Sequence, residues 1–193
     1  MLLHLNPRTT ALVLIDLQKG ILSLPLAPHR AAEVVGQAVA LGRACAETEA
    51  LIVSVNVAFS AGQADRLAVP VDQPPPVPAG GMPAGWSDLA PEIAALPAGV
   101  FITKRQWGAF HGTELDLQLR RRGITTIVLG GIATNFGVES TAREAWQHNY
   151  AVVVAADACT SMGDDLHRFA IEKILPRIAR VRTTAEIIAA LSR

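Results

Sequence analysis

The sequence is poor in cysteine, and its two thiols, Cys45 and Cys159, are too few for a disulfide framework or a four-cysteine zinc site. It also lacks any apolar run near the ~20 residues that a membrane-spanning helix needs, so we expect no membrane partner. The N-terminal segment has neither the charged region nor the small-residue cleavage site of a signal peptide. These absences favour a soluble protein of the cytoplasm.

Charge is also scarce, since only 18% of the residues are charged and 17 basic side chains balance 17 acidic ones. Binding to nucleic acid needs a basic excess, so the composition argues against a nucleic-acid partner. A net charge of zero gives little repulsion between copies, which favours a homo-oligomer, a dimer or larger.

The five histidines are scattered, with no HxH or HExxH spacing, and the glycine-rich turn near residue 130 does not fit GxGxxG. We therefore expect no metal and no bound cofactor. The expected partner is a small-molecule substrate.

Apolar residues, in contrast, make up 50% of the 193 residues. A chain of this length corresponds to one domain and can bury a large core without external staples. We found no internal repeat. The sequence therefore predicts a single domain over residues 1–193.

Short apolar runs alternate with longer segments of helical period. The predicted strands are Thr10–Ile15, Leu51–Phe59, Val100–Thr103, Thr125–Gly130, Ala151–Ala156 and Ile178–Arg182. The predicted helices are Arg30–Glu49, Thr113–Arg122, Val138–His148, Asp164–Ile174 and Ala185–Leu191. Continuous apolar runs are typical of strands buried on both faces, so the pattern predicts a doubly wound α/β fold with a mostly parallel sheet. Ligands of such folds bind at the carboxyl ends of the strands.

The segment 60–99 departs from this alternation. It holds eight of the twelve prolines and several glycines, and no element is predicted within it. A structureless stretch of this length is unusual in a compact domain. We favour a lid or interface loop over passive disorder, with Trp86 near a subunit contact or over the binding pocket.

Two ionisable residues follow predicted strands directly. Asp16 comes after Thr10–Ile15, and Lys104 comes after Val100–Thr103. Taken singly, Asp16 could be a turn residue and Lys104 a solvated strand end. Because parallel strands end at the same edge of a sheet, however, we expect the two charged groups within ~4–6 Å, close enough to perturb each other's pKa.

A third segment, GGIATNFGVESTAREAW, extends from Gly130 to Trp146. A strand ends at its first glycines and a helix begins near Gly137, with Asn135 as a candidate cap. Free backbone N–H groups at a helix start attract anionic or carbonyl oxygens. The alternative is a glycine-rich turn that only packs tightly.

Together, LVLIDLQ, KRQWGAFHGTEL and GGIATNFGVESTAREAW resemble the isochorismatase-like hydrolase superfamily, over about residues 9–184. The resemblance is greatest to small bacterial hydrolases of the family that have no assigned substrate. It implies a Rossmann-like three-layer α/β/α sandwich and a hydrolase activity on a small organic molecule.

Many amide-hydrolysing members of that family use an Asp–Lys–Cys triad. The resemblance implies that Asp16 is the acid and Lys104 the lysine, whereas Gly137 stands at the position of the cysteine. Glycine cannot form a covalent intermediate. Cys45 lies in a predicted helix and Cys159 lies outside the nucleophile position, so we expect neither thiol to replace it.

True isochorismatases also lack the cysteine, and they cleave a vinyl ether with water. By that resemblance, Asp16 is the general acid, Lys104 holds it, and water attacks without a covalent enzyme intermediate. Two alternatives stay open. The chain is a catalytically inactive member that binds a metabolite or a partner protein, or it is an amidase whose water nucleophile is activated by Asp16.

The resemblance also implies a substrate-binding turn with a non-proline cis peptide bond between Ile132 and Ala133, whose N–H groups face the site. Asn135 and Phe136 belong to the same turn. Trp107 and Phe110 are candidates for an aromatic wall of the pocket. For Phe110, packing in the core is the slightly favoured alternative.

Overall fold

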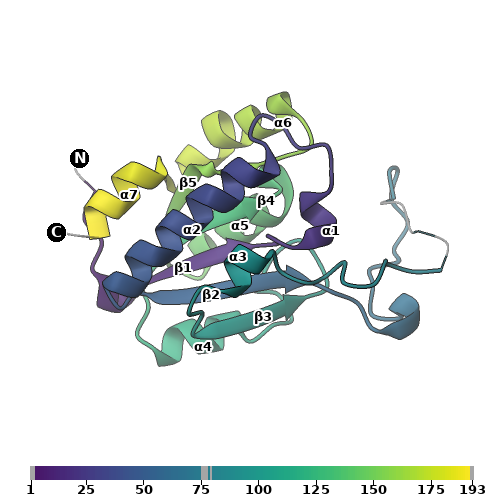
Figure 1. Ribbon diagram of the computed structural model, residues 1–193, viewed down its shortest axis with the longest axis horizontal. Helices are drawn as coiled ribbons and strands as arrows, with labels where there is room; N and C mark the ends of the chain where they lie inside the picture. The colour runs from purple at the N-terminus through teal and green to yellow at the C-terminus, as the bar shows by residue number, and fades with distance from the viewer. Residues whose placement is uncertain (1–2, 75–77, 79, 192–193) are drawn as a thin grey trace.

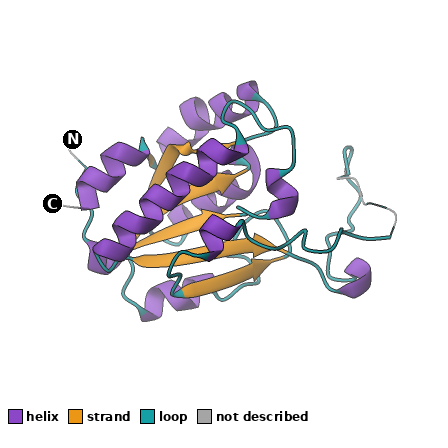
Figure 2. Ribbon diagram, viewed as in Figure 1, coloured by secondary structure: helices purple, strands orange, loops and turns teal. Residues whose placement is uncertain are grey.

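The computed structural model describes residues 3–74, 78 and 80–191. Its strands form one sheet in the order β3-β2-β1-β4-β5-β6, and every neighbouring pair is parallel (Figures 1 and 2). The strands are β1 (Thr10–Ile15), β2 (Leu51–Val57), β3 (Val100–Lys104), β4 (Thr126–Ile132), β5 (Ala151–Thr160) and β6 (Arg180–Arg182).

The α-helices are α1 (Lys19–Leu22), α2 (Ala31–Glu47), α3 (Pro91–Ala94), α4 (Leu115–Arg121), α5 (Glu139–Gln147), α6 (Asp164–Phe169) and α7 (Thr184–Leu191). Shorter helical turns are η1 (Pro7–Thr9), η2 (Ala61–Gln63), η3 (Thr134–Val138), η4 (Ala170–Ile174) and η5 (Leu175–Arg177). No helix in the described part of the chain is long and apolar enough to cross a membrane.

The sheet separates two apolar cores, as the continuous apolar runs predict. Every residue of β1 is buried. Leu12 and Leu14 pack with α2, α3 and α7 on one face, whereas Ala11, Val13 and Ile15 pack with α4 and α5 on the other. The predicted α/β fold with a three-layer α/β/α arrangement is therefore confirmed.

Most predicted elements have somewhat different bounds in the structure, and two of these differences concern the site. β5 continues past the predicted end at Ala156 to Thr160, because the polar residue Asp157 has a partner outside the strand. Its Oδ1 accepts hydrogen bonds from the backbone N–H and hydroxyl of Thr184, at 2.8 and 2.9 Å. The helix predicted over Val138–His148 is preceded by the π-helical turn η3, so that the chain begins to coil at Thr134.

The expectation of a structureless segment over 60–99 is corrected. The 3-10 turn η2 and the helix α3 interrupt it, and α3 starts with Pro91 at its first position, where the missing N–H costs nothing. Buried polar side chains also hold the end of the segment. Asn56 Nδ2 donates to the carbonyl of Ser87 at 2.9 Å, and Gln18 Nε2 donates to that of Trp86 at 3.2 Å. In Figure 1 the described part extends beyond the carboxyl ends of β2 and β3.

Candidate active site

Asp16 stands where β1 ends, and the backbone there is left-handed, with φ at +53°. Aspartate tolerates this conformation better than most residues. The Asp16 N–H still donates to the carbonyl of Val55 at 2.9 Å, so the residue stays fixed to the sheet edge while the chain turns away. The residue is only 5% exposed.

Lys104 ends β3, and β2 lies between it and β1. Its Nζ atom is 2.7 Å from Asp16 Oδ2, which is closer than the sequence predicts. Nζ also donates to the carbonyl of Gln106 at 3.0 Å. With 2% of Lys104 exposed, the two charged groups form a buried ion pair at the carboxyl edge of the sheet.

Burial raises the pKa of Asp16 to about 6, although the charge of Lys104 and its hydrogen bond lower it. Removal from water therefore outweighs the neighbouring cation. Asp16 Oδ1 is buried too, and among the described residues it has no hydrogen-bond partner. Leaving such an acceptor unpaired costs about 1–3 kcal/mol, which a proton or a ligand at Oδ1 would offset. The carboxyl group can thus gain and lose a proton near neutral pH.

Gly137 lies beside this carboxyl group, in the turn η3. A β-carbon at this position would lie 3.3 Å from Asp16 Oδ2 and 3.0 Å from Ile15 Cγ2. A side chain at position 137 would therefore face Asp16, and Gly137 lies beside the Asp16–Lys104 pair as expected. The hydroxyl of Thr141 donates to the Gly137 carbonyl at 2.7 Å and holds the turn in place.

The residues before η3 complete this side of the site. The peptide bond between Ile132 and Ala133 is cis, as the resemblance implies. The carbonyl of Ala133 accepts hydrogen bonds from the N–H groups of Phe136 and Val138, at 3.1 and 3.2 Å. A β-carbon at Gly137 would be 3.4 Å from the Ile132 carbonyl oxygen, so this peptide and Gly137 are close together.

The two aromatic residues suggested for the pocket wall, Trp107 and Phe110, lie in different surroundings. Trp107 is 60% exposed, and its ring centroid lies 4.7 Å from that of Phe136, the residue before Gly137. Phe110, in contrast, is buried against His148 and Tyr150 near the far end of α5, with ring centroids 5.3 and 5.8 Å away. The candidate role of Phe110 in the pocket wall is thus corrected, and the slightly favoured alternative holds: Phe110 packs in the core, where its N–H donates to Glu144 Oε2 on α5 at 3.1 Å.

Asn135 also differs from its expected role as a helix cap. The cap position of η3 is Ala133, and Asn135 lies inside the turn, where its side-chain oxygen accepts a hydrogen bond from the Ser161 hydroxyl. This hydrogen bond links η3 to the end of β5. The buried hydroxyl of Thr134 makes a second link, because it lies 2.8 Å from Nδ1 of His167 on α6.

Both thiols are buried and unsuited to nucleophilic attack. Burial raises the pKa of Cys45 and of Cys159 to about 12, and neither forms a disulfide. Within residues 3–74, 78 and 80–191, no three His, Cys, Asp or Glu side chains come together as a candidate metal site.

The sequence reasoning missed Gln18, which is fully buried two residues after Asp16. Its amide exchanges hydrogen bonds with both backbone groups of Val57, at 2.8 and 3.0 Å. It thereby joins the ends of β1 and β2 and also holds the carbonyl of Trp86. The signal was present in LVLIDLQ, where an amide follows a buried strand closely.

The fold and the buried ion pair at this edge of the sheet define a protein of the parallel α/β class, and comparison with known proteins identifies its family. The sequence profile of the isochorismatase domain matches residues 10–186, so the chain belongs to the isochorismatase family, whose members are generally hydrolases. It is 48% identical over 190 residues to YecD of Escherichia coli O157:H7, an uncharacterized isochorismatase family protein, with 98% of this chain and all of YecD covered.

A solved structure of an isochorismatase family protein from Burkholderia thailandensis matches the whole of both chains, with a TM-score of 0.94 and 46% identity. A more distant relative is the ureidoacrylate amidohydrolase RutB of Pseudomonas savastanoi pv. phaseolicola. It is 30% identical over 194 residues, which cover 84% of this chain and 75% of RutB.

Proposed function

We propose that the protein is an isochorismatase-type hydrolase that cleaves a vinyl ether of a small organic molecule by acid–base chemistry, without a covalent enzyme intermediate. The observation that carries this proposal is the buried Asp16–Lys104 pair, in which the aspartate has a pKa of about 6 and an unpartnered Oδ1. A carboxyl group with such a pKa serves as a proton donor near neutral pH.

In the proposed reaction, protonated Asp16 transfers its proton to the terminal CH2 carbon of the vinyl ether. The ether oxygen then shares the positive charge of the resulting oxocarbenium ion. Water adds to the charged carbon and loses a proton, and the hemiketal collapses to a ketone and an alcohol. Lys104 fixes the carboxyl group by its 2.7 Å contact, and it stabilises the carboxylate that the transfer leaves behind.

The turn beside Asp16 is proposed to receive the substrate. Ile132, Ala133 and Gly137 contribute backbone there, and Gly137 places no side chain against the carboxyl group, where a β-carbon would lie 3.3 Å from Asp16 Oδ2. The exposed Trp107 and the partly buried Phe136, whose rings lie 4.7 Å apart, form the proposed aromatic wall. Phe110 and Asn135 have no part in this proposal, since their side chains are engaged elsewhere.

Amide hydrolysis is a second candidate, favoured by the similarity to a ureidoacrylate amidohydrolase. In that case unprotonated Asp16 accepts a proton from water, and water replaces the missing thiol as nucleophile. The two candidates require opposite protonation states of one carboxyl group, so they predict different isotope patterns and different responses to pH.

Turnover of isochorismate in D2O tests the proposal directly. The expected product is pyruvate with one deuteron in its methyl group, detected by NMR, because the transferred proton comes from solvent through Asp16. Asp16→Asn should lower the rate by about 100-fold or more, within the range of general acid catalysis. The matched control Asp165→Asn, at an exposed aspartate, should keep full activity. Turnover unaffected by Asp16→Asn would refute the mechanism.

Alkylation of the cysteines distinguishes the proposed acid–base reaction from catalysis by a thiol. Since Cys45 and Cys159 are buried and have raised pKa values, iodoacetamide should leave the hydrolysis rate unchanged over an hour. Mass spectrometry of the intact protein measures the label. Rapid inactivation with the label on Cys159, prevented by substrate, would contradict the cysteine-free reaction.

A further inference from the structure

The position of the Lys104 ammonium depends on a backbone carbonyl two residues further along the chain. Besides its 2.7 Å contact with Asp16 Oδ2, Nζ donates to the carbonyl oxygen of Gln106 at 3.0 Å. These are the two acceptors of Nζ in the described part of the chain. A lysine ammonium is a compact charge on a flexible stem, so its place is set by the acceptors around it. The direction of the Gln106 carbonyl therefore affects the ion pair.

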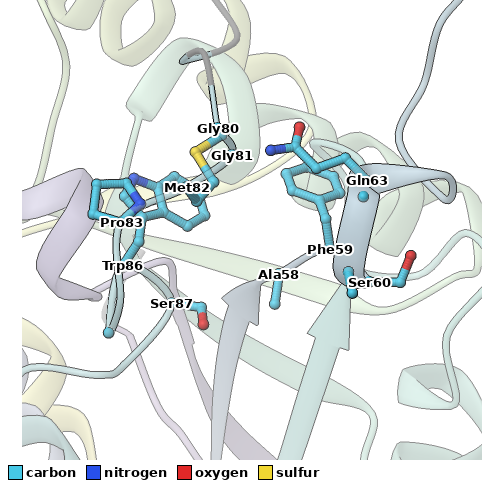
Figure 3. Close-up of a pocket in the computed structure, with 13 residues that line it drawn as sticks. Ala58, Phe59, Ser60, Gln63, Gly80, Gly81, Met82, Pro83, Trp86 and Ser87 are labelled. Atoms are coloured by element: carbon cyan, nitrogen blue, oxygen red, sulfur yellow. The ribbon is translucent and has the colours of Figure 1, made fainter.

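The backbone of Lys104 is fixed by the neighbouring strand. The Lys104 carbonyl accepts a hydrogen bond from the Ala58 N–H at 3.2 Å, and Figure 3 shows Ala58 just past the end of β2. The open pocket in that figure lies between two segments, one after β2 and one before α3, and neither member of the ion pair lines it. Within the described residues, the ammonium is therefore held against Asp16 by the chain that follows Lys104 and not by this pocket.

The side chain of Gln106 closes a turn over residues 106–111, which we call the lysine turn. Its Nε2 donates to the carbonyl of Gly108 at 3.0 Å and to that of His111 at 2.6 Å. A side-chain amide has two N–H donors, so both are used within this turn. The same residue therefore supplies the carbonyl that holds Lys104 and the amide that fixes the turn in which this carbonyl lies.

The helix α5 fixes the far side of the lysine turn. Two N–H groups of the turn donate to side chains on α5 at 3.1 Å, from Ala109 to Thr141 Oγ1 and from Phe110 to Glu144 Oε2. A β-carbon at Gly108 would collide with the Glu144 carboxylate, so the turn lies directly against the helix. Because α5 continues from η3, the turn rests on the element that lies beside Asp16. Gln106 thus connects a docked turn to the flexible ammonium.

We propose that Gln106 is a positioning residue for the reaction: its amide closes the lysine turn so that its backbone carbonyl holds the Lys104 ammonium against Asp16. It is assigned to act through Lys104 and not through contact with the substrate. The inference deepens the proposed function and rests on it for the reaction that the ion pair carries out. Without the amide, the carbonyl is free to turn away, and the ammonium moves away from Asp16 with it.

A purely structural role predicts a different result. Gln106 is partly exposed, and such an amide can stabilise a surface turn without any effect on the site. Its replacement would then lower the melting temperature and leave Asp16 unchanged. In the positioning role, the loss acts on the charge next to Asp16, whose attraction weakens with distance. Burial raises the pKa of Asp16 and Lys104 lowers it, so a displaced ammonium should raise this pKa further.

The test is a titration of Asp16 that needs no substrate. The protein is labelled with ¹³C at the aspartate carboxyl carbons, and NMR follows the signal that Asp16→Asn removes, from acid to mildly alkaline pH. Gln106→Met keeps the length of the side chain but has no N–H donor. For an ammonium displaced by about half an ångström, it should raise the pKa of Asp16 by about 0.5–1 pH unit. The matched control Gln118→Met removes a donor to Glu114 and should leave this pKa unchanged.

A double variant locates the effect at Lys104. In Lys104→Met there is no ammonium to position, so adding Gln106→Met should not change the pKa of Asp16 any further. A change in how much water reaches Asp16 would instead alter the pKa in both backgrounds. Thermal melts verify that each variant folds. An Asp16 pKa that Gln106→Met leaves unchanged or lowers, or an equal rise in the Lys104→Met background, would overturn the assignment.

Turnover is measured separately, so the two proposals can fail independently. With isochorismate, Gln106→Met should lower kcat on the pH plateau by about three- to tenfold and leave KM unchanged, because Gln106 acts on the reacting carboxyl group and not on binding. A wild-type protein that hydrolyses nothing, but whose Asp16 titration responds to Gln106→Met, would overturn the proposed function and leave Gln106 as the residue that positions the ion pair. Hydrolysis by a protein whose Asp16 titration does not respond would overturn the assignment of Gln106 alone.

Discussion

At Asp16 two opposing effects act on one carboxyl group. Burial favours the neutral form and Lys104 favours the charged form, and burial prevails. The sequence predicts the pair from two strand ends, but it cannot predict the sign of the shift. That sign depends on how much water reaches the sheet edge, which is set by η3 and by the chain that covers it.

The pH dependence of the reaction follows from this shift. If protonated Asp16 donates the proton, kcat/KM for vinyl-ether cleavage should be level below pH ~6 and fall about tenfold per pH unit above it. If unprotonated Asp16 activates water for amide hydrolysis, kcat/KM should instead rise to pH ~6 and then become level. A profile over pH 4.5–8.5 measures this, and a rising profile for the vinyl ether would contradict the donor role.

Replacing Lys104 by an uncharged residue should move the pH profile of kcat/KM to higher pH. In Lys104→Met the burial of Asp16 remains while the attraction that lowers its pKa is lost, so the falling limb should move to higher pH. The rate on the plateau should fall as well, because the carboxyl group loses its 2.7 Å partner. The control Lys19→Met removes an exposed ion pair with Asp88 and should leave the profile unchanged. A limb displaced to lower pH would contradict the stated cause of the shift.

At the scale of elements, short segments around α1 and α3 enclose the sheet edge. α1 lies under Trp86, and a side chain at Gly20 would collide with that ring. The only side chain small enough for this approach is therefore hydrogen. Gly36, on α2, provides the contrast, since a β-carbon there meets nothing within 4 Å.

A pair of alanine substitutions tests this contact. Gly20→Ala should lower the free energy of unfolding by about 1–3 kcal/mol, because the ring of Trp86 must move. Gly36→Ala should raise it by about 0.5–1 kcal/mol, since alanine loses less backbone entropy in a helix. Urea unfolding measures both. Equal effects of the two substitutions would show that Trp86 does not pack on α1 as described.

Some of these elements could be predicted from the sequence and others could not. Strands such as Thr10–Ile15 were predictable because a strand buried on both faces is apolar throughout. The ordered structure of the segment after residue 60 was not predictable from the sequence. The hydrogen bonds that hold its end come from Gln18 and Asn56, which are distant in sequence. Phe110 and Trp107 are three residues apart, and the sequence favoured the core only slightly for Phe110, because two aromatic residues so close together carry no strong pattern that separates a core position from an exposed one.

At the scale of the whole molecule, the two cores share the same six strands, and we propose that residues 1–193 form one domain. The surface near α6 carries the exposed apolar side chains Met162, Leu166 and Phe169, the last two on one helix face. Together with the net charge of zero, they favour association of copies.

We therefore propose a homo-oligomer, and sedimentation velocity at micromolar concentration should detect a species of at least twice the 20.4 kDa chain. Phe169→Glu, which places a charge on the exposed apolar face, should shift the distribution toward monomer. A wild-type protein that sediments only as monomer would refute the proposal.

The strand order determines how long an unpaired strand edge is exposed while the chain is being synthesised. β1 leaves the ribosome first, yet it lies in the middle of the sheet, between β2 and β4. At about 5–20 residues per second, Thr126–Ile132 follows several seconds later. Throughout that interval the nascent chain carries a strand that is apolar from Ala11 to Ile15 and has an unpaired edge, with which other unfinished chains can pair. Chaperone binding during translation should therefore concentrate on the N-terminal half and end once β4 has emerged.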